Sequence, residues 1–224
     1  MKLTIEQITV IEDTLILNGL KFEDLKLEIT DHIASEIEVL MKENALSFEE
    51  NLKFVFKNWK IQLRPTYSFW FRYSKSTPYI VTNKCTKIVN RILLLSLITG
   101  TLTSFVFSLF MRYLQNEEVV FGLNNLLKFL SITGVILFIY AKYKIWKSIH
   151  LSTFGYLFDK SGFWQIFNLI LIATGVFKFK VNTSIFDFHF IQTIFPITIL
   201  CLSIFYLNLA YNHLQFNKKR TAFQ

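Results

Sequence analysis

The sequence predicts an all-α membrane protein in which a small three-helix module precedes a bundle of four transmembrane helices. Residues 92–111 form a run of twenty without a charge, and at ~1.5 Å per residue this run matches the ~30 Å hydrocarbon core of a bilayer. The composition is 52% hydrophobic with 25 Phe, which is high for a water-soluble domain. Charge is divided along the chain: residues 1–63 hold seven Lys and twelve acids, whereas the remainder holds seventeen cations and four acids.

Residues 1–64 are predicted to form an acidic cytoplasmic module of three amphipathic helices. Thr4 and Ser47 each begin a capping box, in which the side chain three residues later bonds back to the start of the helix. Apolar residues recur at helical spacing in each segment, so each helix has one face to bury. About sixty residues is near the lower limit for independent folding. The three helices are expected at residues 4–18, at 23–43 and from 47 to the residue before Pro65.

Residues 65–91 are expected to form an interfacial elbow between the module and the first span. Five of seven consecutive positions here are aromatic, namely Tyr67, Phe69, Trp70, Phe71 and Tyr73. Aromatic rings among cations that snorkel toward water are typical of a membrane interface. The alternative is a linker whose aromatic rings pack on the module.

The four transmembrane helices are predicted in residues 92–211, followed by a basic cytoplasmic tail at 212–224. The third of them is the weakest, because only about fifteen of its residues are free of charge and these reach only ~22 Å. It therefore needs thinned lipid or a snorkelling lysine to cross fully. The four spans are expected at about 92–111, 123–141, 161–179 and 190–211.

The distribution of Lys and Arg around the spans predicts their orientation. Ten cations flank the spans on the side of the N-terminus, the middle loop and the tail, against three in the other two loops. Because cytoplasmic loops carry the excess of Lys and Arg, both termini and the middle loop are expected in the cytoplasm. The first residues contain no apolar core of the kind found in a cleavable signal peptide.

One face of the first span carries a small residue every fourth position. In lipid, small residues allow helix backbones to approach closely, and this packing drives helix association. The face is therefore expected to contact another helix of the bundle. Its members are Ser96, Gly100, Ser104 and Ser108.

The second helix of the module carries the candidate site, His32 with Glu36. On a helical wheel Glu36 falls inside the apolar stripe and His32 at its edge, four residues away, so the two side chains can touch. A carboxylate on a buried face needs a partner. Three interpretations stay open: a structural hydrogen-bonded pair, a pH-sensitive pair, or a metal site in which Glu28 joins the pair.

The run from Asp24 to Ile33, with its Asp31-His32 pair after a first helix, resembles the HAAS-type (HTH-associated α-helical signalling) module. That module precedes membrane segments in many bacterial proteins, and the resemblance covers about residues 1–63. It implies a bacterial inner-membrane protein of regulatory or sensory role, with a PadR-like regulator as possible cytoplasmic partner, or self-association. The four spans carry no resemblance that we identify.

No catalytic motif is found in the sequence, so an enzyme, a cofactor and a metal are not expected. The spans contain no Asp or Glu, which disfavours a proton-coupled transporter. The sequence pI near 9.4 does not predict nucleic-acid binding, because the cations flank apolar spans. Cys85 and Cys201 are expected to be free thiols.

The expected role is to pass a signal between the bundle and a cytoplasmic partner; the alternative is a small transport component, either a channel or a permease accessory subunit. For a third interpretation, a membrane enzyme that acts on lipid, the only candidate residues are His150 with Asp159 and His189 with Asp187.

Overall fold

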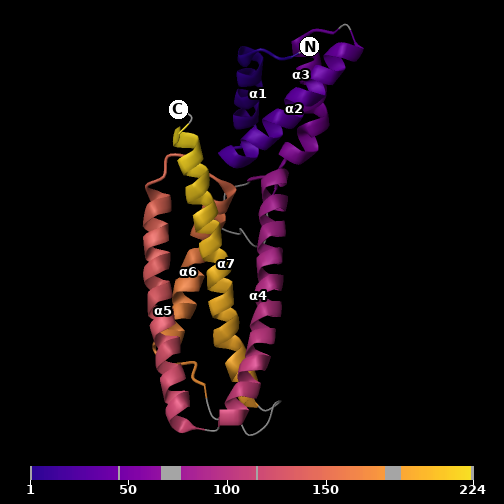
Figure 1. Cartoon of the computed structure of the whole chain (residues 1–224). Coiled ribbons are helices and arrows are strands. Elements are labelled where there is room, and N and C mark those ends of the chain that lie inside the picture. Colours follow the sequence, from indigo (N-terminus) through magenta and orange to yellow (C-terminus); the bar gives the residue numbers. More distant parts are fainter. Residues whose placement is uncertain (1, 45, 67–76, 115, 180–187, 223–224) are drawn as a thin grey trace. The chain divides into compact units, whose positions relative to one another are not determined.

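The computed structural model describes residues 2–44, 46–66, 77–114, 116–179 and 188–222, without the side chains of 112, 114 and 188–191. The chain divides into two compact units. The first unit comprises Met1–Lys87, Ile149–Thr153 and Lys219–Gln224, and the second comprises Ile88–Ser148 and Phe154–Lys218. Apart from one short strand pair, all the regular structure described is helical (Figure 1).

Three helices of the first unit lie where the sequence predicts them: α1 (Ile5–Leu17), α2 (Glu23–Glu43) and α3 (Phe48–Leu63). Both predicted capping boxes are confirmed, at Thr4 and at Ser47. Gly19 follows the end of α1 with φ +87°, a backbone conformation that side chains with a Cβ rarely adopt. Local sequence signals therefore place the ends of these helices.

The core of the first unit is built around α2, which contacts both α1 and α3. Its buried stripe includes Ile29, Ile33 and Ile37, each no more than 1% exposed. The start of α4 (Tyr79–Leu114) belongs to the same unit, and Val81 and Cys85 are buried in it. The unit is thus larger than the predicted three-helix module, because it adds the beginning of α4, the loop at 149–153 and the end of the chain.

A short antiparallel pair joins α3 to α4. Strand β1 (Pro65–Thr66) pairs with β2 (Thr77–Pro78), and the amide of Tyr79 donates to the carbonyl of Arg64 at 2.9 Å. The predicted elbow at 65–91 is therefore helical from Tyr79 onward, because the helix of the first span begins thirteen residues before the apolar run. The five aromatic residues of the elbow lie outside the described residues.

Long apolar helices make up the second unit: most of α4, α5 (Glu117–Trp146), most of α6 (Thr153–Ala173) and most of α7 (Phe188–Ala222). Three helices in the described part of the chain are long and apolar enough to cross a membrane. They are α4 over Tyr79–Met111, α5 over Glu117–Trp146 and α7 over Gln192–Ala222. The predicted basic tail is largely helical, since α7 continues to Ala222.

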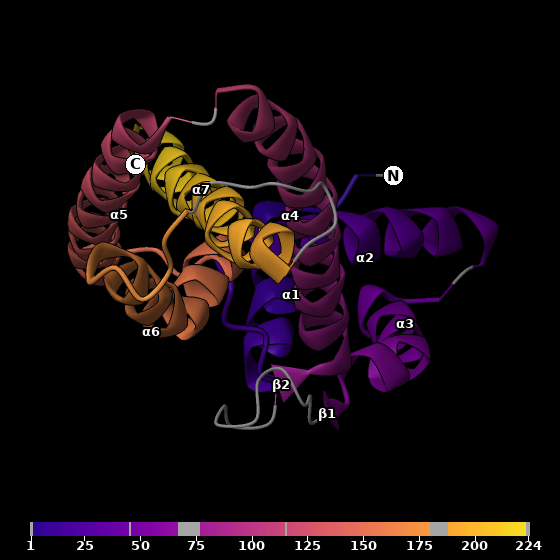
Figure 2. The ribbon, with the colours of Figure 1, turned by 90° about the horizontal axis from the view of Figure 1, so that it is seen from below.

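The helices of the second unit pack around α7, which lies between α4 and α5 when viewed along the bundle (Figure 2). Gly100 of α4 lies against Thr198 of α7. Phe138 of α5 stacks on Phe158 of α6, with ring centroids 5.2 Å apart. At the end of the bundle where α5 begins, a core of four buried residues joins α5, α6, α7 and the segment after α6: Leu127, Ile172, Phe179 and Ile197.

Helix α6 ends earlier than the third predicted span. The amide of Gly175 donates to the Ile172 carbonyl and that of Val176 to the Leu171 carbonyl, the pattern of a glycine-terminated helix. Gly175 has φ +79°, so the chain turns there rather than continuing to residue 179. Asp159 and Lys160 stand in the first half of α6, which leaves thirteen residues or ~20 Å of helix free of charge.

Candidate functional site

The first turn of α2 carries two carboxylates, Glu23 and Asp24, that bind residues distant in the sequence. Phe22 stands at the N-cap and supplies no side-chain hydrogen bond to the helix. The first amides of a helix need acceptors from elsewhere. The amide of Glu23 finds one in the carbonyl of Leu151, at 2.8 Å. The loop between α5 and α6 therefore caps α2.

Asp24 makes the reciprocal contact with the first residue of α6. Its Oδ1 accepts the backbone amide of Thr153 at 2.8 Å, and its Oδ2 accepts the Thr153 hydroxyl. Hydrogen bonds to a charged acceptor contribute about 1.5–3 kcal/mol each. A carboxylate at the N-terminus of a helix is further stabilised by the helix dipole. Each of the two helix starts is thus capped by the other segment.

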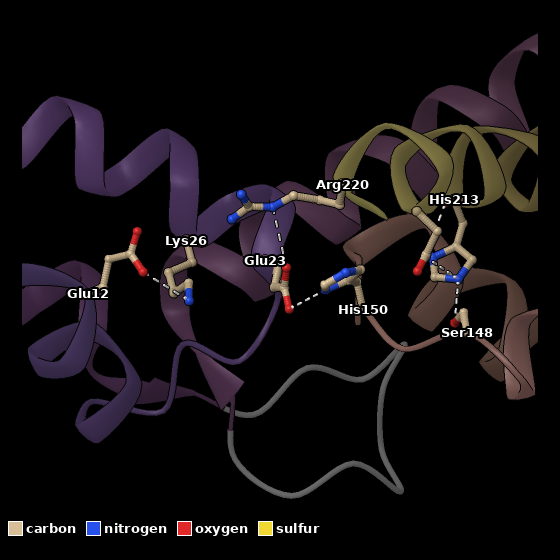
Figure 3. A network of polar contacts seen from close by, with 8 residues as sticks. Glu12, Glu23, Lys26, Ser148, His150, His213 and Arg220 are labelled. Carbon is tan, nitrogen blue, oxygen red and sulfur yellow. Dashed lines mark hydrogen bonds and ion pairs between the residues drawn. The ribbon is translucent and has the colours of Figure 1, made fainter. Parts of the chain in front are cut away.

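Glu23 holds two basic side chains, one on each oxygen. His150 Nδ1 lies 2.9 Å from Oε1, and Arg220 Nε lies 3.6 Å from Oε2 (Figure 3). Because an ionised carboxylate only accepts hydrogen bonds, Nδ1 of His150 carries the proton that it donates. The His150 side chain is 7% exposed and that of Glu23 is 25% exposed, so water screens the contact only in part.

We call this set the α2 clamp: Glu23 and Asp24 with Leu151, Thr153, His150 and Arg220. All of its members belong to the first unit. Both carboxylates are occupied by partners within the chain, so the clamp ties segments together and offers no open catalytic group. Within the described ranges, no three His, Cys, Asp or Glu residues are grouped so as to hold a metal ion.

The predicted pair of His32 and Glu36 is not formed as expected. His32 is exposed on the surface of α2, and Glu36 accepts instead from Nε1 of Trp59 on α3, at 3.0 Å. Glu28, the third member of the possible metal site, pairs with Lys84 of α4 at 2.6 Å. The helical wheel did not identify this contact because it considers partners on one helix, whereas the half-buried carboxylate of Glu36 is bound by an indole of α3.

All four residues of the predicted packing face on α4 are buried: Ser96, Gly100, Ser104 and Ser108. A Cβ built on Gly100 would lie 2.4 Å from Oγ1 and 2.8 Å from Cα of Thr198. No side chain fits there, so the backbones of α4 and α7 approach closely at this point. The Ser104 hydroxyl donates to the Gly100 carbonyl at 2.6 Å, which satisfies a polar group inside the bundle.

A buried histidine joins three segments of the second unit. His213 of α7 is 1% exposed, and its Nε2 lies 2.9 Å from Ser148 Oγ and 3.1 Å from Asn217 Nδ2 (Figure 3). Its ring presses on Gly155 of α6, where an added Cβ would lie 2.6 Å from Nδ1. Ser148 also donates to the Ile145 carbonyl at 2.6 Å. The hydroxyl proton is therefore engaged at the end of α5, as in a helix cap rather than in an activated nucleophile.

Sequence reasoning missed the α2 clamp because its members come from three distant segments. The one available signal was the acidic first turn of a helix whose N-cap is Phe22, a residue that cannot cap. His150 was noted with Asp159, but Asp159 pairs with Lys142 at 3.2 Å and His150 with Glu23. The other pair noted falls outside what the structure describes, since Asp187 and the side chain of His189 are not included.

Comparison with protein-family models, with curated proteins and with solved structures found no match to this chain.

Proposed function

We propose that this chain is a regulatory or sensory protein of a bacterial inner membrane, which passes the state of its membrane helices to a cytoplasmic partner. The single observation that carries the proposal is the α2 clamp. The loop that it binds directly follows α5 and leads into α6, and Arg220 stands near the end of α7. A shift at the ends of these helices would therefore pull on the first turn of α2.

The proposed topology has four spans with both termini in the cytoplasm. Three helices meet the requirements of a membrane span, and α6 serves as the short fourth in thinned lipid. The excess of Lys and Arg beside the N-terminal module, the middle loop and the tail supports this orientation. To test the orientation, a reporter enzyme that is active only in the cytoplasm is fused near Glu117. Activity of this fusion would contradict the proposed topology.

The proposed partner is a protein, by resemblance a PadR-like regulator or a second copy of the chain. To test this, a photo-crosslinking residue replaces Ser35, which is exposed on α2, in the full-length protein in cells. E23Q/D24N opens the clamp while keeping the side-chain volumes. D31N/E43Q removes the same charge from exposed positions of α2 and serves as the control.

The proposal predicts that E23Q/D24N changes the amount of crosslinked partner, while the control leaves it at the wild-type level. Hydrogen exchange at Thr153 should rise in the same variant, because its amide loses the charged acceptor on Asp24 and keeps only a weaker, neutral one. An unchanged crosslink pattern alongside raised exchange would contradict the regulatory role. Solute flux through the purified protein in liposomes would instead support the transport alternative.

A further inference from the structure

Two lysines of the second unit converge on the turn that ends α6. A Cβ built on Gly175 would lie 3.0 Å from Cε of Lys178 and 3.6 Å from Cε of Lys128. Lys128 belongs to α5 and Lys178 follows α6, so the pair is brought together by the fold and not by the sequence. Figure 2 looks onto this end of the second unit. We call these two residues the lysine pair.

The position of Lys178 is fixed by a neighbouring contact. The side-chain amide of Asn124 donates to the Phe179 carbonyl at 3.0 Å and accepts the Phe179 amide at 2.8 Å. Phe179 is buried and packs on Phe107, with ring centroids 4.6 Å apart. Asn124 stands one helical turn before Lys128, so the contact that anchors this segment on α5 also holds the two like charges together.

Nothing described in the chain neutralises the lysine pair. Neither lysine forms an ion pair with any residue in the described ranges. The C-terminus of α6 faces them, but a helix dipole supplies only about half a negative charge, against two positive charges. Counting only the residues that the structure describes, more than one positive charge is therefore left at this turn.

The depth of Lys128 makes this charge costly. It is the one charged residue between Glu118 and Lys142. A hydrocarbon core of ~30 Å placed against either of these residues leaves the backbone of Lys128 about 9–15 Å inside its boundary. Ionisable residues at such depth usually pair with an opposite charge. The neighbouring side chains of Phe129 and Val176 are 65% and 63% exposed, so the site opens toward lipid.

We propose that the lysine pair binds the phosphate of a phospholipid headgroup, drawn inward at this end of the bundle. Basic sites beside transmembrane helices bind lipid headgroups through such contacts. In phosphatidylcholine the choline cation offsets the phosphate charge, whereas a lipid with a net negative charge has no such cation. The lysine pair is therefore expected to bind the anionic lipid in preference to phosphatidylcholine. The short charge-free stretch of α6 is consistent with a bilayer that is thinner here. This inference does not depend on the regulatory role.

The test uses the full-length protein in a neutral detergent, with bound phosphatidylglycerol or phosphatidylcholine measured by native mass spectrometry. K128Q/K178Q removes both charges, K128R/K178R keeps them, and K53Q/K57Q removes two exposed charges from α3 as the control. We expect phosphatidylglycerol to bind roughly 30-fold more weakly to K128Q/K178Q, since each lysine contributes ~1 kcal/mol, while K128R/K178R and the control retain binding. Wild-type affinity in K128Q/K178Q would overturn the proposal.

Two further measurements use the wild-type protein and do not depend on how the variants fold. In lipid nanodiscs, acylation of Lys178 by an amine reagent should be slower with phosphatidylglycerol than with phosphatidylcholine, with Lys53 as the internal reference. Equal rates would overturn the proposal. If inorganic phosphate alone protects Lys178 equally well in detergent, a soluble anion is the ligand and the lipid assignment is wrong.

Discussion

Isoleucines on α2 and on α5 are used in opposite ways. On α2, Ile33 and Ile37 are fully buried against neighbouring helices, while exposed positions carry mostly polar side chains. On α5, Ile136 and Ile139 are 61% and 56% exposed, and the apolar window of the helix is only 11% buried. Water-soluble proteins rarely leave so large an apolar surface uncovered. Helix α2 thus has the pattern expected of a helix in water, and α5 has the pattern expected of a helix in lipid.

The difference shows what holds each unit together. In the first unit, removal of apolar surface from water is the main stabilising term. In the second unit lipid covers apolar side chains as well as a neighbouring helix does, so close packing and internal polar contacts must select the partners. Gly100 against Thr198 and His213 against Gly155 are contacts of this second kind.

The largest effect is expected when an isoleucine is replaced by alanine on α2 and on α5. Ile33→Ala should lower the free energy of unfolding of the first unit by about 2–5 kcal/mol, because it opens a cavity in a closed core. The same change at Ile136 should cost about 0.5 kcal/mol, the contribution of one lipid-facing residue to membrane insertion. Denaturant titration of both variants in detergent checks the ranking. Equal losses would mean that Ile136 is packed against protein.

A second change tests packing within the bundle. Gly100→Ala should destabilise the second unit by about 1–3 kcal/mol, since the added methyl group overlaps Thr198. Gly122→Ala is the matched control, because Gly122 lies in α5 with nothing within 4 Å of an added Cβ. The control should be neutral or slightly stabilising, as alanine favours a helix more than glycine does. Thermal stability in detergent measures both, and a tolerated Gly100→Ala would exclude the close approach of α4 and α7.

The smallest expected effect concerns pH and the first unit alone. The backbone amide and then the hydroxyl of Ser47 donate to Glu50, and these bonds hold the pKa of the Glu50 carboxyl below its ordinary value. A carboxyl whose pKa is lower in the folded state stabilises the fold at neutral pH, and this stabilisation is lost as pH falls through that pKa. Comparison of Glu50→Gln with wild type should show a small loss of stability at pH 7 that disappears in acid. A loss independent of pH would contradict the role of the charge.

The sequence is most informative where structure is local. Thr4, Ser47 and Gly19 set helix ends through contacts within a few residues, and their helices were predicted closely. The apolar run at 92–111 likewise requires only a length and the absence of charge. Its helix begins earlier than predicted because Val81 and Cys85 are buried in the first unit, a tertiary effect.

Contacts between distant segments were not predictable in the same way. The partner of Glu36 is Trp59, 23 residues away, and the partner of Asp24 is Thr153, 129 residues away. A wheel drawn for one helix identifies a carboxylate that needs a partner but not the partner itself. The small-residue face on α4 could be identified from the sequence, because a small residue at every fourth position lies on one side of a helix. This pattern does not depend on which helix packs against it.

We expect the exposed apolar face of the second unit to lie in lipid and the first unit to lie in water. Spin labels at Ile136 and Val39 test it directly, because these positions are 61% and 50% exposed and differ only in their expected surroundings. The labels are attached to cysteines in a C85S/C201S background, with the protein in liposomes. The label at 136 should be relaxed more strongly by oxygen than by a water-soluble nickel chelate, and the label at 39 more strongly by the chelate than by oxygen. Access of the nickel chelate to position 136 would show that this face of α5 is in water and not in lipid.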